Sequence, residues 1–364
     1  MAAFIQSIST TVPPFVTPQG QIADFMVKHL DLSQNEERKL RVLYRASGIG
    51  QRYSVLQDFS KNLNGQSFFK EDAFPSAKPR MSLYQQHAIR LAETACDMAL
   101  KESETQRSEI THLVAVSCTG MYAPGLDIEL IESLGLNTDT QRTSINFMGC
   151  YAAFNALKTA TNIVRSNDHA KVLVICVELC SIHLQDKKND ENLLANAIFG
   201  DGAAAMIISG KKGKKSLELS SFYNDLALSG KDEMGWFIGD YGFEMKLSTK
   251  VPEVIREGIG ELTKRLLSKI KLDLSDINYF AIHPGGKRIL EVIEEELKIT
   301  KEQNQPARDI LRKYGNMSSP TVLFVIKEIL DKMTKDDDQK HMLSFAFGPG
   351  LTLESAVLKA HIDA

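Results

Sequence analysis

Apolar runs of strand length alternate with amphipathic helical segments from about residue 82 onward, and this order constrains the fold more than any other feature of the sequence. A helical pattern over 84–103 leads to the apolar run 112–118, whose length and β-branched residues predict a buried strand. A helix beginning near Cys150 and strands over 171–177 and 203–209 follow. The first half therefore predicts an α/β unit of strand, helix, strand and strand.

The second half of the chain is expected to repeat this order of elements. Helices are predicted over 251–270, 285–297 and 318–330, and strands over 278–284, 342–347 and 351–359. No repeat is visible at the level of individual residues, so an internal duplication rests on element order alone. We place the two halves at residues 1–215 and 216–364.

The first 90 or so residues contain turn-rich stretches and one strongly charged helical segment, 33–47, for which Ser33 is the expected N-cap. We expect this part of the chain to form a peripheral region that covers a ligand.

Composition indicates a soluble protein that acts on small molecules. Hydrophobic residues make up 43% and charged residues 24%, and 43 Lys and Arg face 46 Asp and Glu. This balance predicts neither nucleic-acid binding nor attraction to an anionic membrane. The N-terminus lacks the basic and apolar regions of a signal peptide, and no window approaches the length of a membrane-spanning helix. We therefore expect a cytoplasmic location.

The cysteines favour neither disulfides nor a metal site. There are five, an odd number, and no two are spaced as CxxC. The ordinary role of each is that of a small buried apolar side chain. Each is therefore considered singly, and no metal ligand is predicted.

Cys150 has the surroundings of a nucleophile. It follows Gly149 and precedes a long apolar helical pattern, which places the thiol at a helix N-terminus. The positive end of the helix dipole and the free N–H groups there favour thiolate over thiol. The alternative is a cysteine that only fills a tight turn between strand and helix.

His283 and Asn316 are the expected partners of Cys150. His283 ends an apolar strand and precedes Pro284 and two glycines, at the edge where α/β sheets bind ligands. As an imidazolium it would pair with a thiolate and donate to an oxyanion. Asn316 precedes a helix, and its amide offers a second donor; its alternative role is a helix N-cap.

Five motifs resemble one known family. In order along the chain they are MGCYAAFNAL, FGDGAAA, HPGGKRILE, YGNMSSPTVLF and FGPGLTLES. Together they resemble the chalcone synthase-like type III polyketide synthases over nearly the full length. The resemblance implies the thiolase fold, with five layers (αβαβα) and two pseudo-duplicated halves, a homodimer, and Cys150, His283 and Asn316 as the catalytic triad.

The same resemblance implies an acyltransferase that uses coenzyme A thioesters. Cys150 would be loaded with an acyl-CoA starter and extended by decarboxylative condensation with malonyl-CoA, and the product would then cyclise. Phe199 matches a gatekeeper phenylalanine that keeps water from the malonyl carboxylate. Neither a metal nor a redox cofactor is required.

Several positions depart from the plant-type pattern or line its cavity. Met245 stands at the second gatekeeper position, and Trp236 replaces a small glycine, so we expect a cavity of different shape. Cys180 and His183 replace threonines. The remaining expected substrate-binding residues are Cys118, Thr119, Ser318, Gly348, Pro349 and Gly350. Plain packing is the alternative for each cavity residue.

The coenzyme A entrance matches the family only in part. Lys39 is retained, whereas the other two basic positions fall on Val42 and Ala46. Arg45, beside them, is the expected replacement because a guanidinium reaches phosphate from a neighbouring position. For Arg41, an ordinary charged helix face is the better interpretation.

Three other functions remain open at this point. One is a β-ketoacyl synthase that performs a single condensation, although no distinct basic patch for a carrier protein is visible. The second is a cysteine hydrolase, which would leave malonyl-CoA intact, and the third is a non-catalytic dimeric scaffold. The sequence does not name the starter, the number of extensions, the mode of cyclisation or the pathway.

Overall fold

The computed structural model describes residues 2–60, 67–70 and 74–363. Its strands are β1 Phe4–Thr11, β2 Phe15–Pro18, β3 Gln51–Ser54, β4 His112–Ser117, β5 Gln141–Asn146, β6 Lys171–Leu179, β7 Asp201–Ser209, β8 Lys215–Leu226, β9 Met234–Gly239, β10 Gly242–Leu247, β11 Ile277–Ile282, β12 His341–Gly348 and β13 Thr352–Ile362. Its α-helices are α1 Gln19–His29, α2 Gln34–Ala46, α3 Ala77–Glu102, α4 Leu126–Leu134, α5 Ala152–Ser166, α6 Asp190–Ile198, α7 Val251–Ser268, α8 Lys287–Leu297, α9 Gln305–Tyr314 and α10 Thr321–Lys332.

Nine strands form one continuous sheet in the order β11-β12-β13-β8-β1-β7-β6-β4-β5. It divides into two parts whose strands follow one pattern, hereafter the first sheet, β1-β7-β6-β4-β5, and the second sheet, β8-β13-β12-β11. In each sheet the first two pairs are antiparallel and the next pair is parallel. The sheets join only where Phe4 and Ile5 of β1 pair with Glu218 and Leu217 of β8. This equivalence supports the duplication that element order predicted.

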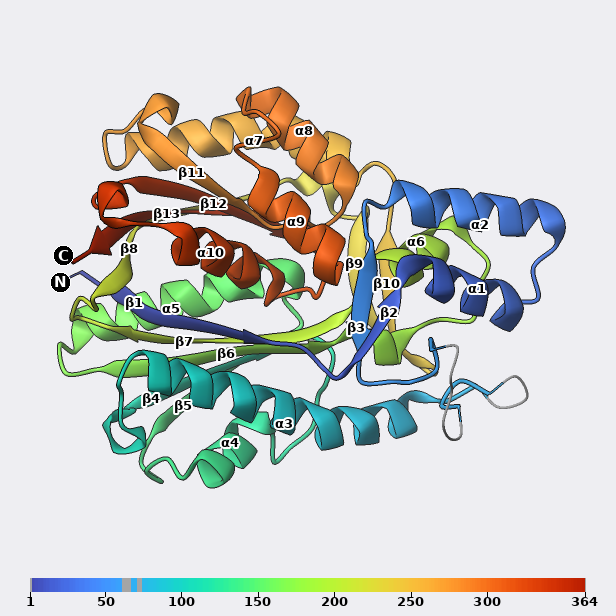
Figure 1. Cartoon of the computed structure of the whole chain (residues 1–364), viewed down its shortest axis with the longest axis horizontal. Helices are drawn as coiled ribbons and strands as arrows, with labels where there is room; N and C mark the ends of the chain where they lie inside the picture. Colours follow the sequence, from blue (N-terminus) through green and yellow to red (C-terminus); the bar gives the residue numbers. More distant parts are fainter. Residues whose placement is uncertain (1, 61–66, 71–73, 364) are drawn as a thin grey trace.

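Helices lie on both sides of each sheet (Figure 1). The α5 and α10 helices lie between the sheets, α3 and α4 cover the outer face of the first, and α7 and α8 cover that of the second. The expected αβαβα arrangement of five layers is therefore confirmed. Because helices cover both faces of the sheets, β6 and β7 are buried almost throughout, as their apolar runs predicted.

The first 90 residues are less peripheral than expected. β1 is an internal strand of the framework, between β7 and β8. The α1 and α2 helices and the small β2–β3 sheet do lie together at one end of the molecule (Figure 1). Ser33 is the N-cap of α2 as predicted, and its backbone N–H donates to the Glu36 carboxylate over 2.9 Å. Residues 61–66 and 71–73 lie outside the described part of the chain.

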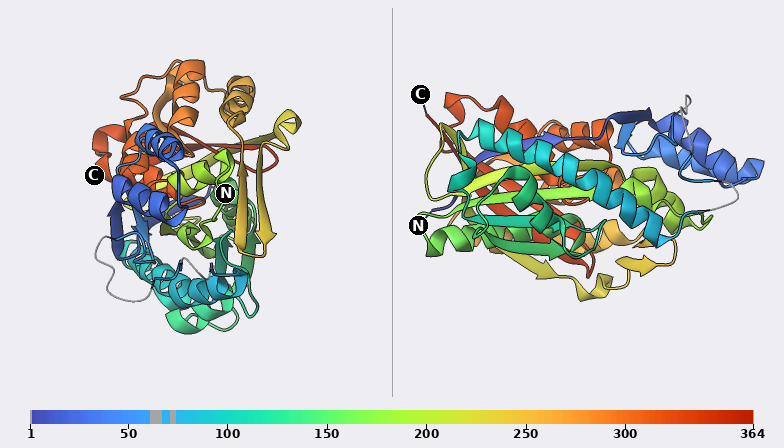
Figure 2. Two further views of the ribbon diagram at one scale, coloured as in Figure 1. Left: turned by 90° about the vertical axis from the view of Figure 1, so that its right-hand side faces the viewer. Right: turned by 90° about the horizontal axis from the view of Figure 1, so that it is seen from below.

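The two strands β9 and β10 had no clear signal in the sequence. The β9–β10 hairpin forms a separate two-stranded sheet along one side of the molecule (Figure 2, yellow strands in the left view). Its Phe237 and Ile238 are exposed, so apolar residues do not mark one buried face there.

Within the described residues, no helix has the length and apolar character that crossing a membrane requires.

Candidate active site

Cys150 lies in a turn whose backbone is unusual. It follows β5 in the 3-10 turn Gly149–Tyr151, which leads directly into α5, so its predicted position at a helix start is confirmed. Gly149 has φ +79°, and a Cβ there would lie 2.6 Å from the Pro349 side chain. Phe147 also has positive φ, +58°. Such strained backbone costs about 1–3 kcal/mol for a residue other than glycine and is typical of functional sites.

The side-chain amide of Asn316 lies against the thiol. Its Oδ1 accepts from the Ser318 backbone N–H over 2.8 Å and lies 3.9 Å from Cys150 Sγ, from which it can accept the thiol hydrogen. Its Nδ2 donates to the Gly285 carbonyl over 3.3 Å and lies 3.8 Å from the same sulfur. The N-cap of α10 is Pro320, so the alternative role of Asn316 as the helix cap is excluded.

His283 is buried with its ring free of partners. It directly follows β11, and its backbone N–H donates to the Phe345 carbonyl over 2.8 Å. The side chain is almost inaccessible, yet neither ring nitrogen bonds to any described residue. Together with Cys150 and Asn316, it lines one cavity of about 310 Å³. An unpartnered buried imidazole in such a cavity is suited to bind a substrate atom.

Burial opposes the charge state expected for Cys150 and His283. It raises the pKa of the Cys150 thiol to about 11, although hydrogen bonds from Ser318 and Asn316 oppose the shift. It also lowers the pKa of His283 to about 3. Both shifts favour a neutral thiol and a neutral imidazole, so burial opposes the thiolate–imidazolium pair expected from the sequence.

Cys150 nevertheless differs from the other four cysteines. Burial raises the pKa of all five thiols, and the shift at Cys150 is the smallest. Cys118 accepts a backbone hydrogen bond from Gly149 over 3.0 Å, and Cys180 lines a second cavity, described below, that Cys150 also lines. Cys150 alone lies beside Asn316 and shares a cavity with His283.

Two cavities meet at Cys150. The cavity of about 310 Å³, hereafter the outer cavity, and a second of about 60 Å³, the inner cavity, share Cys150, Phe199, Met234 and Met245. Phe199 and Met245 thus lie at the junction, where gatekeepers are expected. Met234 also lies there, although the sequence did not single it out.

The inner cavity brings together most of the expected substrate-binding residues. It is lined by Cys118, Thr119, Cys180, His183, Trp236, Met245, Ser318 and Pro349. Gly348 and Gly350 line neither cavity. A Cβ on Gly348 would lie 2.5 Å from the Tyr151 ring, and Gly350 has φ +122°. Both glycines are therefore required by the backbone where β12 turns into β13. Lys39 and Arg45 also line neither cavity.

Trp236 and His183 form an aromatic wall of the inner cavity. The Trp236 indole donates to the Cys118 carbonyl over 2.7 Å. His183 accepts from the Phe243 N–H over 2.9 Å, so its other nitrogen donates to the Thr119 carbonyl over 2.7 Å. Its ring stacks on Phe243 at 4.4 Å. Burial lowers the pKa of His183 to about 3, so this histidine is neutral, and with both ring nitrogens hydrogen-bonded it has a structural role.

Glu178 is a buried carboxylate that the sequence analysis missed. It accepts from Ser319 Oγ over 2.6 Å, Thr119 Oγ1 over 2.8 Å and the Cys118 N–H over 2.9 Å. Burial raises its pKa. The network fixes the loop that carries Cys118 and Thr119. One signal was available, since Glu178 is the only charged residue after Lys171 in the apolar strand β6.

Arg52 is a second residue near the site that the sequence analysis did not identify. It lines the inner cavity and donates to the carbonyls of Asn196 and Phe199, which holds the end of α6 that positions Phe199. The residues around it in sequence, QRYS, form only a short strand and carry no motif. No local pattern marked this role.

The comparisons with known proteins agree on one family. Family models of the chalcone and stilbene synthases match the N-terminal domain at residues 1–212 and the C-terminal domain at residues 225–361. An alpha-pyrone synthesis polyketide synthase-like protein from Mycobacterium tuberculosis is 32% identical over 97% of this chain and 90% of its own length.

Solved structures agree as well. The structure of PKS-I from the brown alga Ectocarpus siliculosus matches with a TM-score of 0.93 and 30% identity, covering 98% of both chains. The C-terminal type III polyketide synthase domain of Steely1 from Dictyostelium matches with a TM-score of 0.91 and 29% identity, covering 100% of both chains. The chain therefore belongs to the chalcone and stilbene synthase family of type III polyketide synthases. It has their thiolase fold and is an acyltransferase.

Proposed function

We propose that the chain loads an acyl-CoA starter on Cys150, extends it with malonyl-CoA and cyclises the product, with Cys150, His283 and Asn316 as the catalytic residues. One observation carries this assignment. Three distant segments place a thiol, an unpartnered imidazole and an amide donor around one cavity. Residues 1–215 would supply the nucleophile and residues 216–364 the other two groups.

Loading begins with proton transfer from Cys150 to His283. The neutral imidazole accepts the thiol proton as the sulfur attacks the thioester carbonyl. Asn316 Nδ2 donates to the oxyanion that forms. Coenzyme A then leaves and takes the proton back from His283. The result is an acyl group on Cys150 and a free CoA thiol, with His283 neutral again.

Extension follows from the same donors. Malonyl-CoA loses carbon dioxide, and the bonding electrons form an enolate whose oxygen accepts from His283 and Asn316. Phe199, at the junction of the cavities, keeps water from the carboxylate and so favours its loss. The enolate carbon attacks the acyl group on Cys150, and the cysteine sulfur leaves as a thiolate that takes up a proton from water. The product is a β-ketoacyl-CoA two carbons longer.

The inner cavity supports a product of limited size. It is far smaller than the outer cavity, and Trp236 forms part of its wall. The flexible Met245 at the junction suits a linear acyl chain better than a bulky aromatic one. We therefore propose aliphatic starters and, in line with the name of the mycobacterial relative, an alpha-pyrone as the product class.

Replacing Trp236 with glycine should enlarge the products. An indole fills on the order of 200 Å² of contact surface, so its loss opens the inner cavity. Trp236→Gly should accept larger starters or add at least one malonyl unit. The measurement is the product profile by mass spectrometry with a panel of acyl-CoAs.

Phe237→Gly is the matched control for this substitution. It adds the same flexibility to β9, but its side chain is exposed, so the product profile should stay that of the wild type. Thermal denaturation establishes that both variants fold. An unchanged starter preference and chain length in folded Trp236→Gly would refute the steric role of Trp236.

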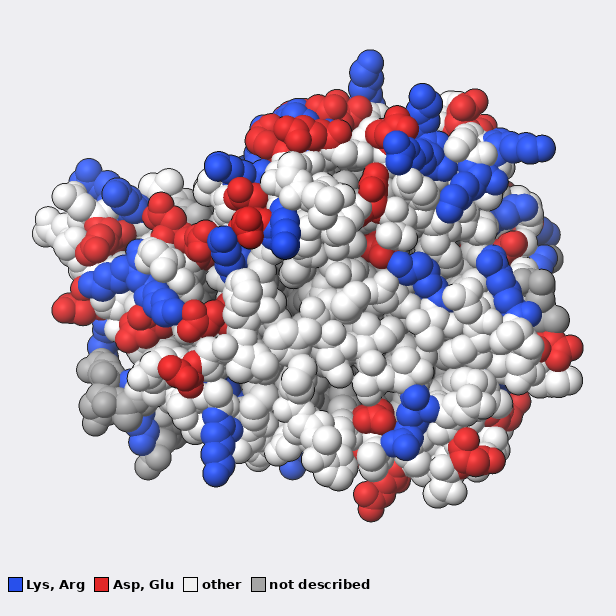
Figure 3. Space-filling model, turned by 180° about the vertical axis from the view of Figure 1, so that it is seen from behind, with Lys and Arg blue, Asp and Glu red and all other residues white. Residues whose placement is uncertain are grey.

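We also propose a homodimer formed at the free edge of β5. This strand ends the framework, and most of its residues are exposed. Beside it lies a hollow of about 290 Å³ whose lining includes the exposed apolar residues Met121 and Ile128. The face seen in Figure 3 also has a broad central area without charged side chains. Such features favour a second copy of the chain.

The wild type should sediment at twice the 40.5 kDa of the chain. Met121→Glu combined with Ile128→Glu should shift it toward the monomer, because two carboxylates would be buried without partners. Met98→Glu, with the same exposure of 46% on α3, should leave the dimer intact. A monomeric wild type, or a dimer untouched by the double substitution, would count against this interface.

We propose a cytoplasmic location, where coenzyme A thioesters are available.

A further inference from the structure

The turn that carries Cys150 gathers backbone N–H groups in one place. Met148 is right-handed, with φ −87° and ψ −16°, and Gly149 has φ +79°. This alternation is typical of a backbone nest, in which successive N–H groups point toward one acceptor. Gly149 and Cys150 are buried, so the donors of this turn need a partner from elsewhere in the chain.

The partner is the sulfur of Cys118, which directly follows Ser117 at the end of β4. The Gly149 N–H donates to Cys118 Sγ over 3.0 Å, and the same sulfur lies 3.8 Å from the Gly149 carbonyl. Burial raises the pKa of this thiol, and hydrogen bonds from the Gly149 and Met148 backbones oppose the shift. One side chain therefore accepts from the two N–H groups that directly precede the nucleophile.

The backbone of Cys118 is itself fixed at both of its polar groups. Its N–H donates to Glu178 Oε2 over 2.9 Å, and its carbonyl accepts from the Trp236 indole over 2.7 Å. Glu178 belongs to the interior strand β6 and Trp236 to the β9–β10 hairpin. Because these two elements hold Cys118, its sulfur is a rigid acceptor that restricts the donors bound to it.

The turn is confined from a second direction as well. A Cβ on Gly149 would lie 2.6 Å from the side chain of Pro349, which lies between β12 and β13. The Cys118 sulfur and the Pro349 ring together leave the turn little room to shift. The position of Cys150 Sγ relative to the other two candidate catalytic residues depends on this turn.

We propose that Cys118 is a positioning residue, whose sulfur holds the turn that aims Cys150 at the thioester carbonyl. This assignment rests on the proposed function and deepens it. Cys118 also lines the inner cavity, yet its hydrogen bond with Gly149, rather than its size, is what loading requires. A misplacement of about 1 Å costs on the order of 10²-fold in rate, so a small shift of the turn is enough to slow attack.

Three substitutions separate the hydrogen bond from the volume of the side chain. Cys118→Ser keeps an acceptor, Cys118→Ala removes it with a loss of volume, and Cys118→Val removes it with a gain of volume. Single-turnover loading of Cys150 from an acyl-CoA, followed by intact-mass analysis, should slow about ten- to a hundredfold in Cys118→Ala and Cys118→Val. Cys118→Ser should stay within about threefold of the wild type. In steady state kcat should fall with KM unchanged, and the calorimetric affinity for coenzyme A should be the same in all three.

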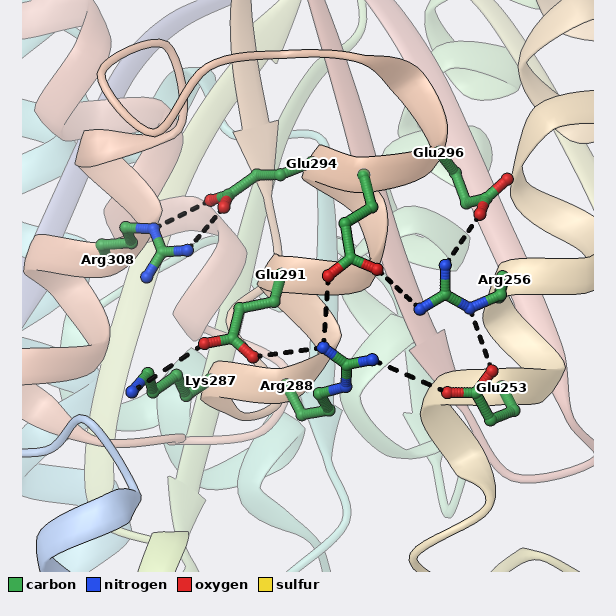
Figure 4. Close-up of polar contacts among 9 residues, drawn as sticks. Glu253, Arg256, Lys287, Arg288, Glu291, Glu294, Glu296 and Arg308 are labelled. Atoms are coloured by element: carbon green, nitrogen blue, oxygen red, sulfur yellow. Dashed lines mark hydrogen bonds and ion pairs between the residues drawn. The ribbon is translucent and has the colours of Figure 1, made fainter.

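Two controls account for the loss of a thiol and for a loss of stability. Cys96→Ala removes a buried thiol from α3 that lines neither cavity. Arg256→Ala removes ion pairs of α7 with Glu253 and with Glu296 of α8, over 2.9 and 2.8 Å (Figure 4), and Arg256 also lines neither cavity. Both variants should load Cys150 at the wild-type rate, whatever their thermal denaturation midpoints.

Two outcomes would overturn the assignment. One is a folded Cys118→Ala that loads at the wild-type rate. The other is a loading rate that follows side-chain volume, with Cys118→Ser slowed like Cys118→Ala, which would make Cys118 only a wall of the inner cavity. A wild type that loads Cys150 but never condenses malonyl-CoA would instead overturn the proposed function, because the loading assay does not depend on condensation.

Discussion

Cys150→Ala is expected to abolish condensation, with a fall of at least about four orders of magnitude, because the acyl chain has no other thiol in reach of both Asn316 and His283. Binding of acyl-CoA, measured by calorimetry, should survive. Decarboxylation of malonyl-CoA should also persist, since the variant keeps both enolate donors.

Cys96→Ala is the control for this substitution. Cys96 is buried in α3 and lines neither cavity, so its loss should leave condensation near the wild-type rate. Intact-mass analysis of wild-type protein with acyl-CoA, followed by peptide mapping, locates the adduct. An acyl group on Cys176 or Cys180 would refute Cys150 as the nucleophile.

The second large effect concerns His283. Between its pKa of about 3 and the Cys150 pKa of about 11, the pair holds one proton, which the imidazole can accept during attack. Because the thiol keeps its proton below its pKa, alkylation of Cys150 by iodoacetamide in the wild type should rise about tenfold per pH unit toward a pKa near 11. His283→Gln should show the same rise, since iodoacetamide reacts with the thiolate once it has formed, whereas condensation loses its proton acceptor. Condensation should fall by about 10²–10⁴.

His87→Gln serves as the control, because His87 lies on α3 and lines neither cavity. Its alkylation profile should coincide with that of the wild type. If His283→Gln condensed as fast as the wild type, then His283 would not accept the thiol proton. If alkylation of the wild type stayed fast and flat down to pH 5, the pair would be a thiolate and an imidazolium at rest, and the neutral state would be wrong.

The sequence predicted the positions of the three candidate catalytic residues better than it predicted their surroundings, for a physical reason. Cys150, His283 and Asn316 each sit where a periodic element begins or ends, so local patterns place them correctly. Their neutral resting state depends on burial by residues far away in the chain, which no local pattern reports. The same applies to Glu178, whose partners come from β4, the loop after it and the turn before α10.

The strands likewise differ in whether the local sequence predicts them. Strands buried on both faces, such as β6 and β7, were visible as apolar runs. The β9–β10 hairpin was not, because the apolar residues Phe237 and Ile238 are exposed there, yet it carries Trp236. The position of β1 inside the framework depends on pairing with β7, about 200 residues later, which lies beyond any local signal.

Mass spectrometry of the products that the wild type makes from a defined acyl-CoA and carbon-13-labelled malonyl-CoA tests the central claim most directly. The account predicts a labelled product at least two carbons longer than the starter, release of carbon dioxide, and a trapped acyl group on Cys150. Hydrolysis of the starter without loss of carbon dioxide from malonyl-CoA would contradict it and would favour a cysteine hydrolase. A product that stops at one condensation and forms only with a carrier-protein thioester would likewise contradict it, in favour of a β-ketoacyl synthase.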